Sequence, residues 1–333
     1  MNTPFRRLRL SIRLTSLLGL LGAALATQAA SNEVARYELT TDSLRQAEAP
    51  HGRIEGPFEF HSRIFADTVR RYWIYVPVQY DAARPASLLV FQDGQRALNP
   101  EGSLRVQNVL DNLIRKREIP VTIGVFITPG NRSTHYPDDL GMANPDHRAQ
   151  EYDALDDRYA RFLIEELLPE VRKQYKITDD PDQHAIGGTS SGAICAFTVA
   201  WHRPDVFRKV ISSIGSFVSI GYRPASGGKP LVPGGDLYPT LIRKSPIRPL
   251  RIFLQDGSND LSNEHGDWFL ANQQMLSALN WANSNADREH RSGPRYDVKH
   301  AWGEGGHSDD HGGALLPDIM RWLWRDDAAT AMQ

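Results

Sequence analysis

Cysteine is nearly absent from this sequence: Cys195 is the only one among 333 residues. A single cysteine excludes an internal disulfide, and it excludes the metal sites that are built from cysteine clusters. Cys195 stands beside Ile194, Ala196 and Phe197, a setting typical of a small buried side chain rather than of a reactive thiol. Any chemistry must therefore come from other residues.

An excess of positive charge is also absent. The 38 lysine and arginine residues are balanced by 40 aspartate and glutamate residues, so the formal net charge is −2. A mildly acidic protein is a poor match for the phosphate backbone of nucleic acid. We therefore expect no nucleic-acid partner, and no feature of the sequence implies a protein partner.

Long apolar runs are missing as well, and the most apolar stretch lies near the amino terminus. Residues 14–26 follow four arginines and end in Ala24-Leu25-Ala26. This run is too short to span a bilayer comfortably, and its flanks predict a cleaved export signal over residues 1–26; a retained anchor is the alternative. Cleavage would leave 34 basic against 40 acidic residues, a formal charge of about −6. We expect an exported protein, periplasmic or secreted, with no membrane contact after cleavage.

The rest of the composition fits one large globular domain. With 41% hydrophobic and 23% charged residues, the chain can bury a single extensive core. We expect a polar lead-in over residues 27–56, one domain over 57–327 and a short tail over 328–333.

The spacing of apolar residues changes along this domain. Residues 57–65 and 70–77 alternate between apolar and polar, which predicts an antiparallel hairpin at a sheet edge. After them, short apolar runs alternate with helical patterns. Strands are expected at 87–91, 121–127, from His184 onward, 210–214, 250–254 and 296–302, and helices at 106–116, 156–175, 191–202, 268–281 and 314–324.

This order predicts an α/β fold: a mostly parallel central sheet with an amino-terminal antiparallel edge hairpin and helices on both faces. The helix at 156–175 should be the longest. Two long segments, 128–155 and 219–245, interrupt the repeat. We interpret them either as lids and substrate walls or as plain insertions.

One motif carries the clearest chemical signal. Gly188-Thr189-Ser190-Ser191-Gly192 reads G-x-S-x-G between a strand-like and a helix-like run, the setting of a nucleophile elbow. A serine hydroxyl is a weak nucleophile until a sharp turn presents it to a base and to backbone N–H groups. The pattern alone is common, and a plain Gly/Ser turn is the simpler alternative. We predict Ser190 as a nucleophile because partners for it follow along the chain.

The partners stand in the order serine, acid, histidine of an α/β-hydrolase. His307 lies in a glycine-rich stretch after the last predicted strand and is placed to take the proton from Ser190. Asp260 lies in a turn after an earlier strand and would orient His307. Asp256 and Glu264 lie close by in sequence, so either one could serve as the acid instead.

The oxyanion hole should combine the backbone N–H of Ser191 with one from the loop after the first domain strand, at Gln92 or Asp93. Aromatic and polar side chains around these segments could line a substrate pocket, although aromatic residues more often pack in the core. The predicted substrate-binding residues are Gln92, Asp93, Trp268, Trp302 and His311.

A metal-dependent hydrolase is a weaker alternative. His307 and His311 stand four residues apart, but the glutamate of an H-E-x-x-H zinc motif is missing and an acidic loop lies between them. We therefore expect no metal and no cofactor.

Four segments together resemble the esterase D and enterochelin-esterase-like family of esterases, over roughly residues 72–325. They are residues 89–95, 187–192, 253–260 and 303–307. The resemblance implies an α/β-hydrolase fold and a serine mechanism, and its G-x-x-D turn falls on 257–260, which favours Asp260 as the acid. One departure is Ala193, where many members carry glycine.

The resulting prediction is an exported serine carboxylester hydrolase that forms an acyl-enzyme intermediate on a small-molecule or glycan ester. The family includes feruloyl and acetylxylan esterases and mycolyltransferases, so acetyl or hydroxycinnamoyl esters of polysaccharides and siderophore lactones are the expected substrates. A non-catalytic exported binding protein and an acyltransferase of the mycolyltransferase type are the alternatives.

Overall fold

The computed structural model describes residues 37–138 and 145–325. The predicted signal segment at 1–26, the start of the predicted lead-in and the predicted tail at 328–333 lie outside these residues. Within the described residues, no helix combines the length and the apolar character that crossing a membrane requires.

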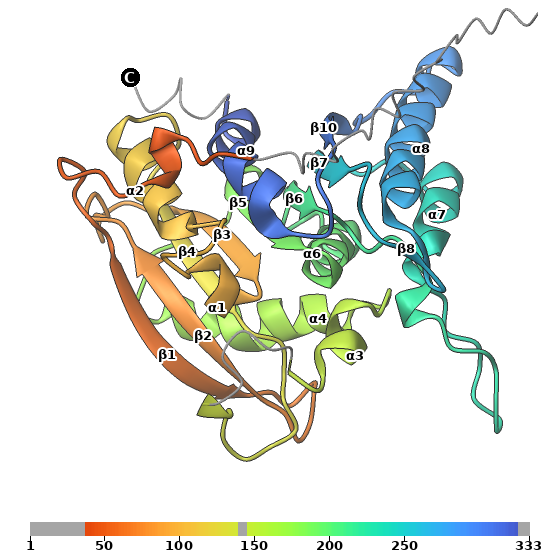
Figure 1. The fold of residues 1–333 in the computed structure, drawn as a ribbon, viewed down its shortest axis with the longest axis horizontal. Coiled ribbons are helices and arrows are strands. Elements are labelled where there is room, and N and C mark those ends of the chain that lie inside the picture. Colours follow the sequence, from red (N-terminus) through yellow and green to blue (C-terminus); the bar gives the residue numbers. More distant parts are fainter. Residues whose placement is uncertain (1–36, 139–144, 326–333) are drawn as a thin grey trace, which may run out of the picture. The chain divides into compact units, whose positions relative to one another are not determined.

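The centre of the fold is an eight-stranded sheet with the order β1-β2-β4-β3-β5-β6-β7-β10 (Figure 1). β1 pairs antiparallel with β2, and β2 pairs antiparallel with β4, while the other neighbours run parallel. The predicted mostly parallel sheet with an antiparallel edge hairpin is confirmed. Its strands are β1 (Arg53–His61), β2 (Val69–Val76), β3 (Ser87–Gln92), β4 (Thr122–Ile127), β5 (His184–Thr189), β6 (Lys209–Ser213), β7 (Arg251–Gly257) and β10 (Asp297–Gly303).

The interior strands are buried along their whole length, and apolar residues stand at the centre of each. Every residue of β3, β4, β5 and β6 is buried. When helices cover both faces of a parallel sheet, the side chains on both faces of an interior strand are shielded from water. The edge strand β1 instead alternates between exposed and half-buried residues and begins at Arg53, earlier than the sequence predicted.

Helices cover both faces of the sheet, as predicted. One face packs on apolar side chains of α2 and α9, and the other on those of α4 to α8. The helices are α1 (Gly94–Ala97), α2 (Val106–Arg115), α3 (Arg148–Tyr152), α4 (Arg158–Arg161), α5 (Leu168–Arg172), α6 (Ser191–His202), α7 (Tyr238–Lys244), α8 (Trp268–Arg288) and α9 (Asp309–Leu323).

The helix predicted at 156–175 is not the longest, and it is not a regular α-helix. α4 passes into a π-helical turn at Phe162–Leu167 and then into α5. Pro169 stands at the start of α5 and has no N–H to bond back into the preceding turn, so the wider π turn takes up the irregularity. The longest helix is α8, with 21 residues.

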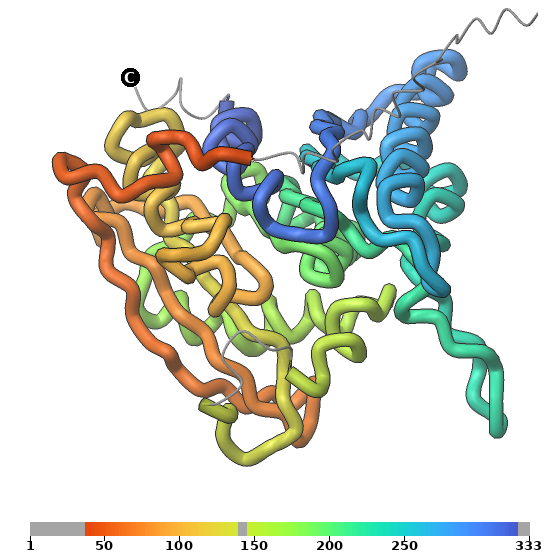
Figure 2. Tube along the Cα trace, in the orientation of Figure 1, coloured from red at the N-terminus to blue at the C-terminus, as the bar shows by residue number. Residues whose placement is uncertain are grey.

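The two long segments differ in how they are held. The described part of 128–155 contains α3 and is fixed by buried ion pairs of Glu151 and Arg148. The segment 219–245 contains α7, and the bridges Arg223–Val232 and Ser226–Lys229 close part of it into a narrow hairpin that extends away from the helices (Figure 2). The described part of the first segment is therefore held firmly against the rest of the fold.

A two-stranded ribbon precedes α8. It is formed by β8 (Ser262–Asn263) and β9 (Gly266–Asp267), and the Asp267 carboxylate caps α8 by accepting from the N–H of Leu270 at 2.8 Å. This capping fixes where α8 begins, and so it fixes Trp268 next to the ends of the central strands.

Candidate active site

Ser190 lies in the sharp turn between β5 and α6, at the carboxyl edge of the sheet. Its φ of 58° and ψ of −124° are values that residues other than glycine rarely adopt. The flanking glycines allow the turn, because a Cβ on Gly188 would lie 2.5 Å from the backbone of Gly192. A Cβ on Gly192 would lie 3.1 Å from Oδ2 of Asp93. The local geometry is that of a nucleophile elbow.

The three predicted catalytic side chains meet at this edge. The Oγ atom of Ser190 is 2.9 Å from Nε2 of His307, and Nδ1 of His307 is 2.6 Å from Oδ1 of Asp260. An ionised carboxylate can only accept, so Nδ1 carries the hydrogen and Nε2 is free to accept from the Ser190 hydroxyl. This is the arrangement in which a histidine acts as a general base.

Of the three carboxylates that the sequence left open, Asp260 is the one that contacts His307. Burial by itself raises the pKa of Asp260, but the hydrogen bonds from His307 and Asp256 outweigh it, and the pKa lies below its ordinary value. Glu264 is 81% exposed and pairs with His265 at 3.9 Å. Asp256 is fully buried beside Asp260.

Ser216 is a further neighbour of the nucleophile that the sequence analysis did not identify. Its Oγ lies 3.1 Å from Oγ of Ser190 and 3.0 Å from Nε1 of Trp268. The indole N–H only donates, so Ser216 accepts from Trp268 and can direct its own O–H toward Ser190. Ser216 follows β6, the strand next to β5, and its place beside this sheet edge was the available signal.

Replacing Ser216 with alanine is expected to lower kcat about fivefold with little change in KM. The variant removes one hydrogen bond that orients the nucleophile, worth about 1 kcal/mol, and leaves the Trp268 N–H without its partner. Steady-state kinetics on one ester substrate measure both constants. Thr198→Val is the matched control, because it removes a buried hydroxyl of α6 that bonds Tyr238 at 2.6 Å, away from Ser190. Equal losses in both variants would contradict a role for Ser216 at the nucleophile.

Trp268 packs against the ring of His307. Its side chain is 2% exposed, and its ring meets the His307 ring edge-on, with centroids 5.7 Å apart. These contacts favour a role in holding His307 and Ser216. The predicted contact of Trp268 with substrate stays a prediction.

The loop after β3 is fixed by buried polar contacts. Arg148 donates from Nε and Nη2 to the two oxygens of Asp93 at 3.0 and 2.7 Å, and Tyr159 donates to Oε1 of Gln92 at 2.6 Å. The side chains of Gln92 and Asp93 are therefore engaged inside the protein. The N–H of Asp93 is directed at the Tyr152 hydroxyl, at 3.3 Å. The predicted oxyanion role of this loop and of the Ser191 N–H stays a prediction.

His311 lies behind the loop that carries His307. Its ring stacks on Tyr37 with centroids 4.0 Å apart, and its Nδ1 accepts from Gln255 at 2.9 Å. Burial lowers the pKa of His311, which favours the neutral ring that these contacts need. A Cβ on Gly303 would lie 2.5 Å from the His311 ring, so glycine at 303 lets the two segments pack. This setting favours support of the loop over contact with substrate.

Trp302 lies on β10 at the edge of the sheet. It is half-buried and packs against Phe269 and His300, with ring centroids 5.8 and 4.9 Å apart. The structure does not bring Trp302 into contact with Ser190 or His307, and its substrate role stays a prediction. Among the described residues, no three His, Cys, Asp or Glu side chains gather in a way that could hold a metal ion.

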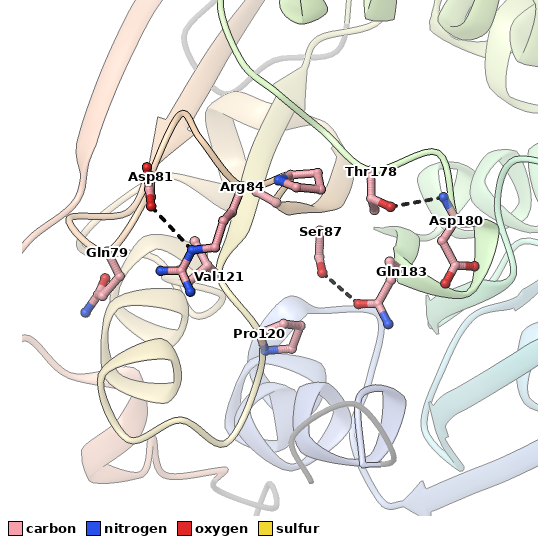
Figure 3. A pocket seen from close by; sticks show the side chains of 11 residues that line it. Gln79, Asp81, Arg84, Ser87, Pro120, Val121, Thr178, Asp180 and Gln183 are labelled. Atoms are coloured by element: carbon pink, nitrogen blue, oxygen red, sulfur yellow. Dashed lines mark hydrogen bonds and ion pairs between the residues drawn. The ribbon is translucent and has the colours of Figure 1, made fainter. Parts of the chain in front are cut away.

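A surface hollow of about 560 Å³ lies at the opposite edge of the sheet (Figure 3). It is lined by residues that precede the parallel strands, and polar pairs such as Ser87 with Gln183 cross it at 2.8 Å. Ligands of open α/β sheets bind at the carboxyl ends of the strands, where Ser190 lies. The hollow is therefore separate from the candidate active site.

Two curated sequences show what the chain is similar to. An iron(III) enterobactin esterase of Dickeya dadantii (strain 3937) is 25% identical over 154 residues, which cover 45% of this chain and 31% of that protein. The uncharacterized protein YbbA of Bacillus subtilis (strain 168) is 22% identical over 149 residues, 44% of this chain and 57% of that protein. The chain thus spans less than two thirds of the length of either relative.

Solved structures share the fold. The enterobactin esterase FES of Shigella flexneri matches with a TM-score of 0.61 and 22% identity, over 86% of this chain and 62% of that one. A CE1 ferulic acid esterase of Anaeromyces mucronatus, in complex with ferulic acid, matches with a TM-score of 0.60 and 15% identity, over 87% of this chain and 97% of that one. The predicted α/β-hydrolase fold is confirmed.

A family model also matches most of the chain. The Esterase model, described as Putative esterase, matches residues 66–323, a range that includes Ser190, Asp260 and His307. The chain belongs to this esterase family.

Proposed function

We propose that this protein is a serine carboxylester hydrolase. The observation that carries the proposal is the continuous hydrogen-bonded series from Asp260 through His307 to Ser190, with Ser190 on a nucleophile elbow. Membership of the esterase family and the shared fold support it.

The geometry supports a two-step reaction. His307 accepts the Ser190 proton at Nε2 while Oγ attacks the ester carbonyl, and the imidazolium that forms is stabilised by Asp260. Collapse of the tetrahedral intermediate breaks the bond to the alcohol, which leaves with the proton from His307. Water then attacks the acyl-enzyme with His307 again as the base. This step releases the carboxylic acid and restores the Ser190 hydroxyl.

We further propose that the substrates are acetyl or hydroxycinnamoyl esters of polysaccharides, or siderophore lactone esters. Support comes from what the similar proteins are described as: enterobactin esterases and ferulic acid esterases. Export to the periplasm or beyond is proposed on the amino-terminal sequence pattern over residues 1–26. Either location would bring the enzyme to such esters.

A fluorophosphonate probe tests the proposed function directly. We expect the folded protein to form one covalent adduct at Ser190, found by peptide mass spectrometry, and Ser190→Ala to form none. A panel of acetyl esters, feruloyl esters and a catecholate trilactone, each with and without an acceptor alcohol, then defines the substrate. Absence of the adduct in folded protein would favour a binding protein, and transfer to the alcohol in place of hydrolysis would favour an acyltransferase.

A further inference from the structure

The carboxylate of Asp260 has one oxygen whose role the triad does not explain. Oδ1 accepts from Nδ1 of His307 and from the N–H of Leu261, both at 2.6 Å. Oδ2 is buried, and no N–H or hydroxyl donor in the described part of the chain reaches it. A buried charged oxygen without a donor is costly, so a donor is to be expected there.

The neighbouring carboxyl is that of Asp256, at the end of β7, which acts on the pKa of Asp260. Asp256 is fully buried. Its Oδ1 accepts from the N–H of Gly257 at 2.7 Å, and its Oδ2 accepts from Nδ2 of Asn272 at 2.6 Å. The carboxyls of Asp256 and Asp260 lie close enough for a hydrogen bond between them to shift the pKa of both, up for Asp256 and down for Asp260. Two carboxyl groups can share a hydrogen bond only if one of them holds a proton.

The proton belongs on Asp256. Burial raises the pKa of Asp256 to about 9, and the hydrogen bond and the negative charge of Asp260 contribute to the rise. Asp260 faces His307 and is kept ionised, whereas no cation among the described residues is a main cause of the pKa shift of Asp256. From α8 it meets the uncharged amide of Asn272, and its register partner on β10 is Trp302. Burial is thus the main cause of its raised pKa, and Asp260 is the charged neighbour that adds to it.

We propose that Asp256 is a positioning residue of the triad, which donates its carboxyl O–H to Oδ2 of Asp260 and so fixes the carboxylate that orients His307. This inference rests on the proposed serine-hydrolase function. It gives Asp256 a different role from that of an alternative triad acid. The contacts with Gly257 and Asn272 hold the Asp256 carboxyl in place for this donation.

The inference predicts the alkaline side of the rate profile. As the pH rises through about 9, wild-type Asp256 loses its proton, and the hydrogen bond is replaced by repulsion between two carboxylates. kcat should therefore fall on the alkaline side. Asp256→Asn keeps an N–H donor at the same place but has no proton to lose, so its kcat should stay level there. Asp256→Leu supplies no donor and should lower kcat at neutral pH by about 10- to 100-fold.

The experiment compares wild type, Asp256→Asn and Asp256→Leu between pH 6 and 10.5, with kcat and KM measured for one ester. We expect Asp256→Asn to keep kcat within about threefold at pH 7 and to lose the alkaline fall. Asp111→Asn is the matched control. Asp111 lies on α2 and is another buried carboxyl, whose Oδ1 accepts from the Tyr75 hydroxyl at 2.7 Å. Its replacement should leave the pH profile of kcat unchanged.

Two results would overturn the inference: an alkaline fall in Asp256→Asn like that of wild type, or full activity of folded Asp256→Leu. If Asp256→Leu does not fold, as judged by circular dichroism, the Asp256→Asn profile alone decides. Fluorophosphonate labelling of Ser190 in the wild type separates the two proposals. If the wild type is labelled but the pH profile of Asp256→Asn matches that of wild type, only the role of Asp256 is refuted. If the wild type is not labelled, the hydrolase function is refuted, and this inference with it.

Discussion

Replacing Ser190 with alanine is expected to lower kcat for ester hydrolysis by about 10⁴- to 10⁶-fold. The variant removes the hydroxyl that His307 contacts at 2.9 Å, and with it the acyl-enzyme route. Binding should change little, because the methyl group of alanine fits where the serine side chain lay. Initial rates at saturating ester, together with KM, measure the effect.

The double variant Ser190→Ala/His307→Ala gives a sharper test. Residues that act as one unit lose their contribution together, so the double variant should be no slower than Ser190→Ala by more than about threefold. Ser87→Ala serves as control, since Ser87 bonds Gln183 at the opposite edge of the sheet and should keep the wild-type rate within about twofold. A Ser190→Ala rate above about one hundredth of wild type would point to another nucleophile.

The elbow and the histidine could be predicted from the sequence because local pattern and chain order both mark them. Gly188 and Gly192 flank Ser190 at the spacing that the turn requires, and His307 follows the last strand within a glycine-rich loop. The edge hairpin and the buried strands were predictable for a similar reason. The spacing of apolar residues along a strand indicates whether one or both of its faces are covered by other parts of the protein.

The choice of acid was harder because three carboxylates lie within nine residues of one turn, Asp256 to Glu264. Spacing along the chain does not tell which side chain turns toward His307. The resemblance of the G-x-x-D turn favoured Asp260, and the 2.6 Å contact with His307 agrees with it. The hydrogen bond proposed between Asp256 and Asp260 has no signature in the sequence.

The contacts of Ser216 and Trp268 could not be predicted either, since they depend on how α8 packs against the strand ends. Trp268 reaches Ser216 across 52 positions of the chain. A tryptophan near a predicted active site suggested a substrate wall, but its N–H and ring are directed at Ser216 and His307. The π turn before Pro169 was missed because the apolar spacing of 156–175 is helical in either form.

The segment 128–155 is held by a buried ion pair whose two members lie 81 residues apart in the chain. Glu151 and Arg70 are fully buried, and Nη1 and Nη2 of Arg70 donate to the two Glu151 oxygens at 2.7 and 3.0 Å. Glu151 also accepts from the N–H of Gly130 at 3.1 Å, and it contacts Nδ1 of His147 at 2.9 Å. One carboxylate thus joins three parts of the segment to β2.

Replacing Glu151 with glutamine is expected to lower the free energy of unfolding by about 3–5 kcal/mol. The variant keeps the size of the side chain but leaves the guanidinium of Arg70 buried without its counter-charge, over the Phe162 ring at 4.2 Å. The stacking cannot replace the lost ion pair, because a cation–π contact contributes only about 0.5–2 kcal/mol. Differential scanning calorimetry should show Tm lower by about 6–15 °C.

Glu165→Gln is the matched control for this prediction. It makes the same chemical change in the ion pair with Arg161, where the two side chains are 46% and 49% exposed and the expected cost is below about 1 kcal/mol. Protease cleavage within 128–155 should also become faster in Glu151→Gln but not in Glu165→Gln, because only the first variant releases that segment from β2. If the Tm values of the two variants agreed within about one or two degrees, the buried charge of Arg70 would not be the reason that Glu151 stabilises the protein.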